Sequence, residues 1–361
     1  MYERKRIIDE LEGAIREEQV DPMVGDRWLL ASALQKSIRR GDTERAARAA
    51  LGLWQHDRRR FWDRLLVIAT EDVGCGDPDV LVRVLVGIAS TELRRRKGDI
   101  QVGLHLTRLL CGAVKSRLVD AVFIQAEKGD RFHRVRQEFA SASNQLLARC
   151  VRDEEIPLIE RAIAVWLLAG TKRFRSEIMP PRAGDVGKAI AAVRATAAPK
   201  MLTQACIDVN SRLQWPLALH IPLIWQEVQR HTTTVHRHTI PASQDIEGMP
   251  VCAADMFTRV GKASFRELQR AVPALQPFTA QQLGLGIFYL DGGLVDKELT
   301  APGLNAIQRA GEMADLESAG LTPAGYADLR HTLRDSMELL NDIRQTHLRR
   351  HLAGLPAGGQ K

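Results

Sequence analysis

The chain has 361 residues, of which 45% are hydrophobic and 26% are charged, and its formal net charge is +7. Aromatic residues make up only 5% of the composition, which favours α-helix and argues against a large β-sandwich or β-barrel. No stretch approaches the roughly 20 apolar residues needed to span a bilayer, and the charged N-terminus MYERKRIIDELEG has no apolar signal core, so we expect a cytoplasmic protein without membrane partners.

The N-terminal half is predicted to form a block of short helices. Residues 1–23 are expected to contain an N-terminal helix, and from residue 28 onward apolar residues recur at helical spacing. Asp77 directly precedes Pro78, which is a strong helix-start signal because proline fits the first helical turn and fixes its φ angle. About six such helices predict a multi-helix bundle or a solenoid-like block over residues 24–178.

The C-terminal half is predicted to be a second, mostly helical domain over residues 187–352. The proline and glycine content of IMPPRAGDVG, residues 178–187, predicts a linker or surface turn before it. A β-branched run near residues 231–250 is expected to be an extended strand or an ordered loop. Apolar spacing predicts one long final helix over residues 326–352, and residues 353–361 are expected to be a flexible tail. The expected fold class is predominantly all-α.

No cofactor-binding motif is complete in the sequence. A nucleotide-binding loop needs G-x-x-x-x-G-K-[ST], but in RVGKAS Met256 stands at the first glycine position and Ala263 follows Lys262. RAGDVGKAI fails at the same two positions. The five cysteines form no Cys-x-x-Cys pair, which indicates neither a zinc ribbon nor a disulfide framework. We therefore expect a protein without a cofactor and without enzymatic activity.

Histidines near the β-branched run suggest a less favoured interpretation. In an extended segment, His236 and His238 would share a face, and Asp245 could complete a metal site with them. The bland interpretation is a polar loop whose histidines hydrogen-bond locally, because no HExxH motif or cysteine partner is present. The corresponding enzyme hypothesis uses His231 and these two histidines, as weak metal candidates, with Asp245 or Asp255.

Basic side chains occur in five patches within about 100 residues. A packed bundle could gather them on one surface, which would bind a phosphate backbone without sequence preference; a solvated basic face is the alternative. Trp54 and Trp62 could stack on a single strand, although such tryptophans are more often core residues. The side chains expected to bind nucleic acid are Lys36, Arg39, Arg40, Arg94, Arg95, Arg96, Lys115 and Arg117.

Three sequence blocks follow one another at close spacing within residues 29–124. They are SALQKSIRRGDTERAARAALGLW, RLLVIATEDVGCGDPDVL and HLTRLLCGAVKSRLVDAVF. Together they resemble the C-terminal helical region of the RarA/MgsA family, the AAA+ ATPases related to the Werner-helicase-interacting protein. In that family an ATPase module comes first, the helical region mediates tetramer assembly, and the proteins act at stalled replication forks.

The resemblance implies self-association and a setting in DNA replication, recombination or repair. It does not imply ATP hydrolysis, because nothing before residue 29 could be an ATPase module. The matching positions have largely architectural roles in the family: helix entry, capping and the subunit interface. They are Ser32, Lys36, Ser37, Glu71, Asp72, Asp77, Pro78, Lys115 and Ser116.

These observations lead to a DNA-associated accessory protein as the first functional hypothesis. It would self-assemble through the helical block into a homo-oligomer such as a tetramer, and it would contact the DNA backbone or a replication-recombination ATPase. A protein-interaction scaffold without DNA binding is the alternative, and the histidine-dependent metalloenzyme is the least favoured hypothesis.

Overall fold

The computed structural model describes residues 2–172, 176, 178–213 and 217–355. In these residues 19 α-helices are joined by loops and short helical turns, and the strands form two two-stranded ribbons. The prediction of a predominantly all-α protein is therefore confirmed. Within the same residues, no helix is both long and apolar enough to cross a membrane.

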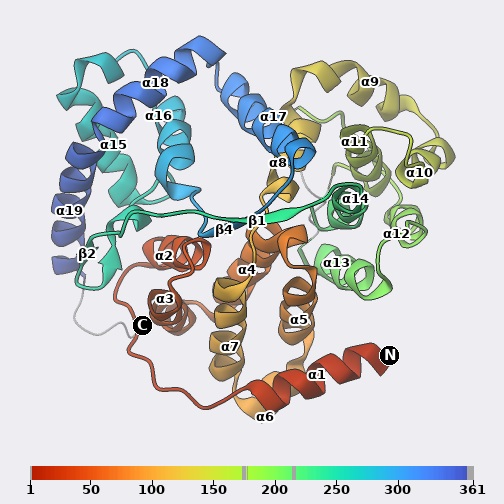
Figure 1. Cartoon of the computed structure of the whole chain (residues 1–361), viewed down its shortest axis with the longest axis horizontal. Helices are drawn as coiled ribbons and strands as arrows, with labels where there is room; N and C mark the ends of the chain where they lie inside the picture. The colour runs from red at the N-terminus through yellow and green to blue at the C-terminus, as the bar shows by residue number, and fades with distance from the viewer. Residues whose placement is uncertain (1, 173–175, 177, 214–216, 356–361) are drawn as a thin grey trace.

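Three groups of helices are arranged across the molecule in Figure 1. The central group is α1 (Tyr2–Ala14), α2 (Arg27–Arg39), α3 (Thr43–His56), α4 (Arg58–Ile68), α5 (Pro78–Ala89), α6 (Thr91–Lys97), α7 (Asp99–Gly112) and α8 (Leu118–Lys128). The group on the right is α9 (His133–Ser141), α10 (Asn144–Arg152), α11 (Leu158–Ala169), α12 (Val186–Arg194), α13 (Lys200–Leu213) and α14 (Leu217–Gln229). The group on the left is α15 (Arg259–Ala271), α16 (Ala280–Ile287), α18 (Pro323–Asp335) and α19 (Met337–Ala353), while α17 (Pro302–Ser318) packs on α8.

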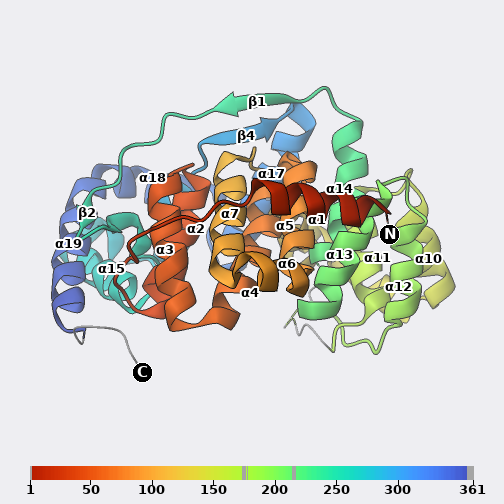
Figure 2. The same ribbon diagram turned by 90° about the horizontal axis from the view of Figure 1, so that it is seen from below.

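A long connection between α14 and α15 crosses the outside of the central helices. Its strand β1 (Thr234–Arg237) pairs antiparallel with β4 (Lys297–Thr300), and β2 (Asp245–Ile246) pairs with β3 (Met249–Pro250). Figure 2 shows β1 along one edge of the molecule, above the helices. The segment predicted to be either a strand or an ordered loop therefore contains both.

Local capping signals explain several helix starts in the central group. The side chain of Asp77 accepts a hydrogen bond from the Val80 amide at 3.1 Å, and Pro78 is the first residue of α5. This confirms the helix start predicted from the Asp-Pro pair. Asp42 caps α3 in the same way, through the amide of Arg45 at 3.1 Å. Each cap satisfies an amide that the helix itself leaves without a partner.

The hydrophobic cores of the molecule do not meet at the predicted domain boundary, residues 178–187. One large core contains buried residues from Ile7 through Leu352 and includes the helices on both sides of residues 178–187. A smaller core lies among the left-hand helices, between Phe265 and Ile343. The predicted linker at 178–187 therefore does not separate two cores, because α11 packs on α12 and α13 packs on α5.

The final helical stretch consists of two helices rather than the single predicted one. At Ser336, between α18 and α19, the hydroxyl donates to the Thr332 carbonyl at 2.8 Å. The break lets both helices direct apolar side chains into the smaller core, where Leu329, Leu333, Leu340 and Ile343 are buried. Of the predicted tail, residues 356–361 lie outside the described residues.

Candidate functional site

Five of the eight cations predicted to bind nucleic acid form ion pairs with aspartates inside the molecule. The side chains of Lys36, Arg39 and Lys115 are buried. A buried cation needs a carboxylate partner, because an unpaired charge is costly to remove from water. The five ion pairs are Lys36–Asp255, Arg39–Asp72, Arg40–Asp291, Lys115–Asp296 and Arg117–Asp120.

The other three predicted cations lie on α6. Arg94 pairs with Asp99 at 3.1 Å, and Arg96 pairs with two glutamates. Arg95 is exposed and makes no ion pair within the described part of the chain. The eight cations therefore do not share the single exposed surface that we expected, because five of them neutralise interior aspartates. Phosphate could reach those five only if the aspartates were displaced.

The strongest candidate for a binding site is a cleft of about 470 Å³ between the central helices and the C-terminal helices. Its walls come from α2, α4, α8, α16 and α17 and from the segment before α15. Two π-helical turns, Ala69–Val73 and Phe288–Gly292, border it through Glu71 and Phe288. Such turns are rare and are frequently found at functional sites.

Several positions of the family resemblance meet at this cleft. The Lys36 Nζ donates to the Ser32 Oγ at 2.7 Å, and this hydroxyl donates to Asp255 at 2.8 Å. Glu71 also lines the cleft, and Asp72 lies behind it, where it accepts from Arg39 at 2.7 Å. The remaining positions do not line it; these are Ser37, Asp77, Pro78, Lys115 and Ser116.

The electrostatic balance of the cleft depends on Glu71. Burial raises the pKa of the Glu71 carboxyl to about 8, and the negative charges of Asp120 and Asp72 add to the increase, so the group is neutral at pH 7. Asp255 differs, because Lys36 and Ser32 lower the pKa of its carboxyl although burial opposes them. The ionised groups that line the cleft are five cations (Lys36, Arg39, Arg64, Arg117 and Lys128) and three carboxylates (Asp120, Asp255 and Asp315). Ion pairs neutralise four of these cations, with Asp72 as the partner of Arg39, and Arg64 is the lining cation that forms no ion pair within the described residues.

Two exposed aromatic rings lie at the cleft. The side chains of Trp28 and Phe257 are 42% and 65% exposed. The guanidinium carbon of Arg60 lies 3.7 Å from the Trp28 ring centroid, and that of Arg27 lies 5.4 Å from it. With Arg64, which also lines the cleft, these residues form what we call the Trp28 platform: Arg27, Trp28, Arg60 and Arg64.

The three arginines of the platform repel one another. Burial lowers the pKa of Arg60, and the positive charges of Arg64 and Arg27 lower it further. None of the three forms an ion pair within the residues that the structure describes. The negative charge of Asp57 offsets part of this repulsion at Arg60, but no ion pair neutralises the cluster, in contrast to the cations deeper in the cleft.

Trp54 and Trp62, which could stack on a single strand or belong to the core, pack in and against the large core. The indole nitrogens of Trp54 and Trp62 donate to Asp99 at 2.8 Å and 3.2 Å, and Trp62 is buried. Trp28 was not among the predicted residues: it lies in the first turn of α2, two residues after the Asp26 cap, and the sequence does not show that Arg60 of α4 lies over its ring. The run Arg58–Arg60 was the one available signal, since it placed Arg60 among the basic patches.

The structure does not assemble the histidine site of the enzyme hypothesis. His231 interacts with Glu227 at 3.2 Å, whereas Asp245 and Asp255 are held by Arg45 and Lys36. His236 and His238 are neighbours, with ring centroids 4.5 Å apart. Among the described residues, no group of three or more histidine, cysteine, aspartate or glutamate side chains could hold a metal ion.

Comparison with known proteins adds no constraint on this site. The chain matches no family model, no curated protein and no solved structure.

Proposed function

We propose that this protein is a non-enzymatic accessory protein of DNA metabolism that binds a single nucleic-acid strand at the Trp28 platform. The observation that carries the proposal is the exposed Trp28 ring, with two guanidinium groups beside it that form no ion pair within the described residues. Neither Trp28 nor Phe257 belongs to a hydrophobic core, so core packing does not explain their position.

The chemistry of the platform matches that of a single strand. Aromatic rings and arginine guanidinium planes stack on bases of any sequence, and arginine binds phosphate through paired hydrogen bonds. A phosphate placed among Arg27, Arg60 and Arg64 would relieve their mutual repulsion. The net charge of +7 would add a long-range attraction to any polyanion.

The test is the affinity for a fluorescent single-stranded oligonucleotide, measured by anisotropy at several salt concentrations. Trp28→Ala should weaken binding about tenfold or more, because it removes a stacking surface. Arg60→Gln should weaken binding and should lower the slope of log affinity against log salt by about 0.7, the value for one lost phosphate contact.

The matched control is Arg95→Gln, which removes one exposed, unpaired arginine from α6. This variant should bind like the wild type, and circular dichroism should show that all variants are folded. Absence of binding at low salt would favour the scaffold alternative. An equal loss of affinity in the Arg60 and Arg95 variants would show that binding depends on net charge alone, and would refute the platform.

A further inference from the structure

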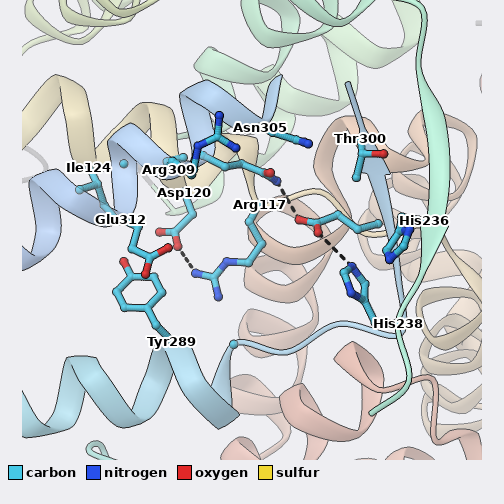
Figure 3. Close-up of a pocket in the computed structure, with 15 residues that line it drawn as sticks. Arg117, Asp120, Ile124, His236, His238, Tyr289, Thr300, Asn305, Arg309 and Glu312 are labelled. Carbon is cyan, nitrogen blue, oxygen red and sulfur yellow. Dashed lines mark hydrogen bonds and ion pairs between the residues drawn. The ribbon is translucent and has the colours of Figure 1, made fainter. Parts of the chain in front are cut away.

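A second cavity, of about 530 Å³, adjoins the cleft. Arg117, Asp120 and Ile124 line both cavities, so the Arg117–Asp120 ion pair lies on the wall between them. Figure 3 shows that α17, the Tyr289 turn and the β1–β4 ribbon border the second cavity. We refer to it as the ribbon pocket.

Each carboxylate of the ribbon pocket already has a donor. Glu298 interacts with the His238 ring nitrogen at 3.3 Å and accepts from the Gln308 amide at 2.9 Å. Glu312 accepts a hydrogen bond from the Tyr326 hydroxyl at 2.6 Å. Together with Asp120, which Arg117 neutralises, these are the acidic groups that line the pocket.

Two side chains of the pocket lack a hydrogen-bond partner within the described residues, and the buried atom among them is the Asn305 Oδ1. Asn305 and Arg309 lie one turn apart on α17, and Figure 3 shows both side chains at the pocket. The Arg309 guanidinium makes no ion pair or hydrogen bond within the described residues, and the Asn305 amide makes no hydrogen bond there. The ring of His236, from β1, lies beside the His238 ring, with the centroids 4.5 Å apart.

We propose that the ribbon pocket binds the phosphate group of a phosphate monoester. Arg309 would hold two phosphate oxygens through its planar guanidinium, while the side-chain amide of Asn305, one turn away on α17, would donate to a third. The volume exceeds that of a phosphate alone and leaves space for an attached sugar beside Tyr289 and Ile124. The phosphate could belong to a small molecule or to the end of a nucleic-acid strand, and only the second case rests on the function proposed above.

Isothermal titration calorimetry with four probes tests this inference. The probes are inorganic phosphate, a nucleoside 5′-monophosphate, and two oligonucleotides of one sequence that carry either a 5′-phosphate or a 5′-hydroxyl. The wild-type protein should bind the monophosphate, and Arg309→Gln should weaken that binding about tenfold or more, since it removes a charged hydrogen-bond donor. Asn305→Ala should cause a smaller loss, and Arg95→Gln should cause none.

The probes separate the two sources of phosphate. A stronger affinity for the 5′-phosphorylated oligonucleotide, lost in Arg309→Gln, assigns the pocket to a strand end. Binding of the monophosphate or of inorganic phosphate without that preference assigns it to a small molecule. Trp28→Ala should leave monophosphate binding intact, so failure of the platform and failure of the pocket are distinguishable. The inference is overturned if no phosphate probe binds, or if Arg309→Gln binds them like the wild type.

Discussion

Removing Asp255 alone from the buried Lys36–Asp255 ion pair should destabilise the fold more than removing both charged side chains. The two side chains are 4% and 15% exposed, so Asp255→Ala leaves a lysine ammonium in the interior without its counter-charge. Loss of one partner of a buried pair typically costs about 3–5 kcal/mol. Ser32 still accepts a hydrogen bond from the Lys36 Nζ at 2.7 Å, which places the expected loss near the lower end, about 3 kcal/mol.

Urea denaturation followed by circular dichroism measures this loss. The matched control is Asp245→Ala, because Asp245 also pairs with a central-group arginine, Arg45, but these side chains are 36% and 29% exposed. An exposed pair contributes at most about 1 kcal/mol. Adding Lys36→Met to Asp255→Ala should recover most of the stability, since no buried charge remains. The reasoning is refuted if Asp255→Ala costs no more than the control, or if the double variant recovers nothing.

Three further substitutions test the electrostatics and packing of the fold. In the folded protein the pKa of Glu71 is about 8, above its ordinary value of 4.5. The free energy of unfolding of the wild type should therefore fall as the pH rises between these two values. Glu71→Gln should flatten this pH dependence and raise the urea midpoint at pH 8. Burial lowers the pKa of His220 from 6.5 to about 4, so the free energy of unfolding should fall by up to roughly 3 kcal/mol on acidification from pH 6.5 to 4. His220→Phe should remove this fall. The same acid-induced fall in the variant and the wild type would contradict the role of His220. A Cβ at Gly311 would lie 2.6 Å from the Ala121 Cα, so Gly311→Ala should lower the melting temperature by separating α17 from α8, whereas Gly13→Ala, with open space around it, should not.

The helices of the central group could be predicted from sequence because their signals are local. The Asp77–Pro78 start and the all-α class depend on residues within a few positions of one another. The break at Ser336 was missed for a related reason: the apolar spacing continues through it, and only packing against the smaller core separates α18 from α19.

The candidate site could not be predicted because its partners are far apart in sequence. Lys36 and Asp255 are separated by 219 positions, and Lys128 and Asp315 by 187. A run of arginines and lysines therefore indicates charge but not exposure, and the cations of the resemblance proved to be neutralised by a later part of the chain. The surroundings of Trp28 could not be predicted either, because Arg60, which lies over its ring, comes from another helix, α4.

Photocrosslinking locates a bound strand most directly. A single-stranded oligonucleotide with 5-iodouracil at successive positions would be irradiated with the protein, and the crosslinked residues would be identified by mass spectrometry. Our account predicts crosslinks at Trp28 or Phe257, the two exposed rings of the cleft. Crosslinks confined to the rest of the surface, or a yield unaffected by Trp28→Ala and Phe257→Ala, would contradict it.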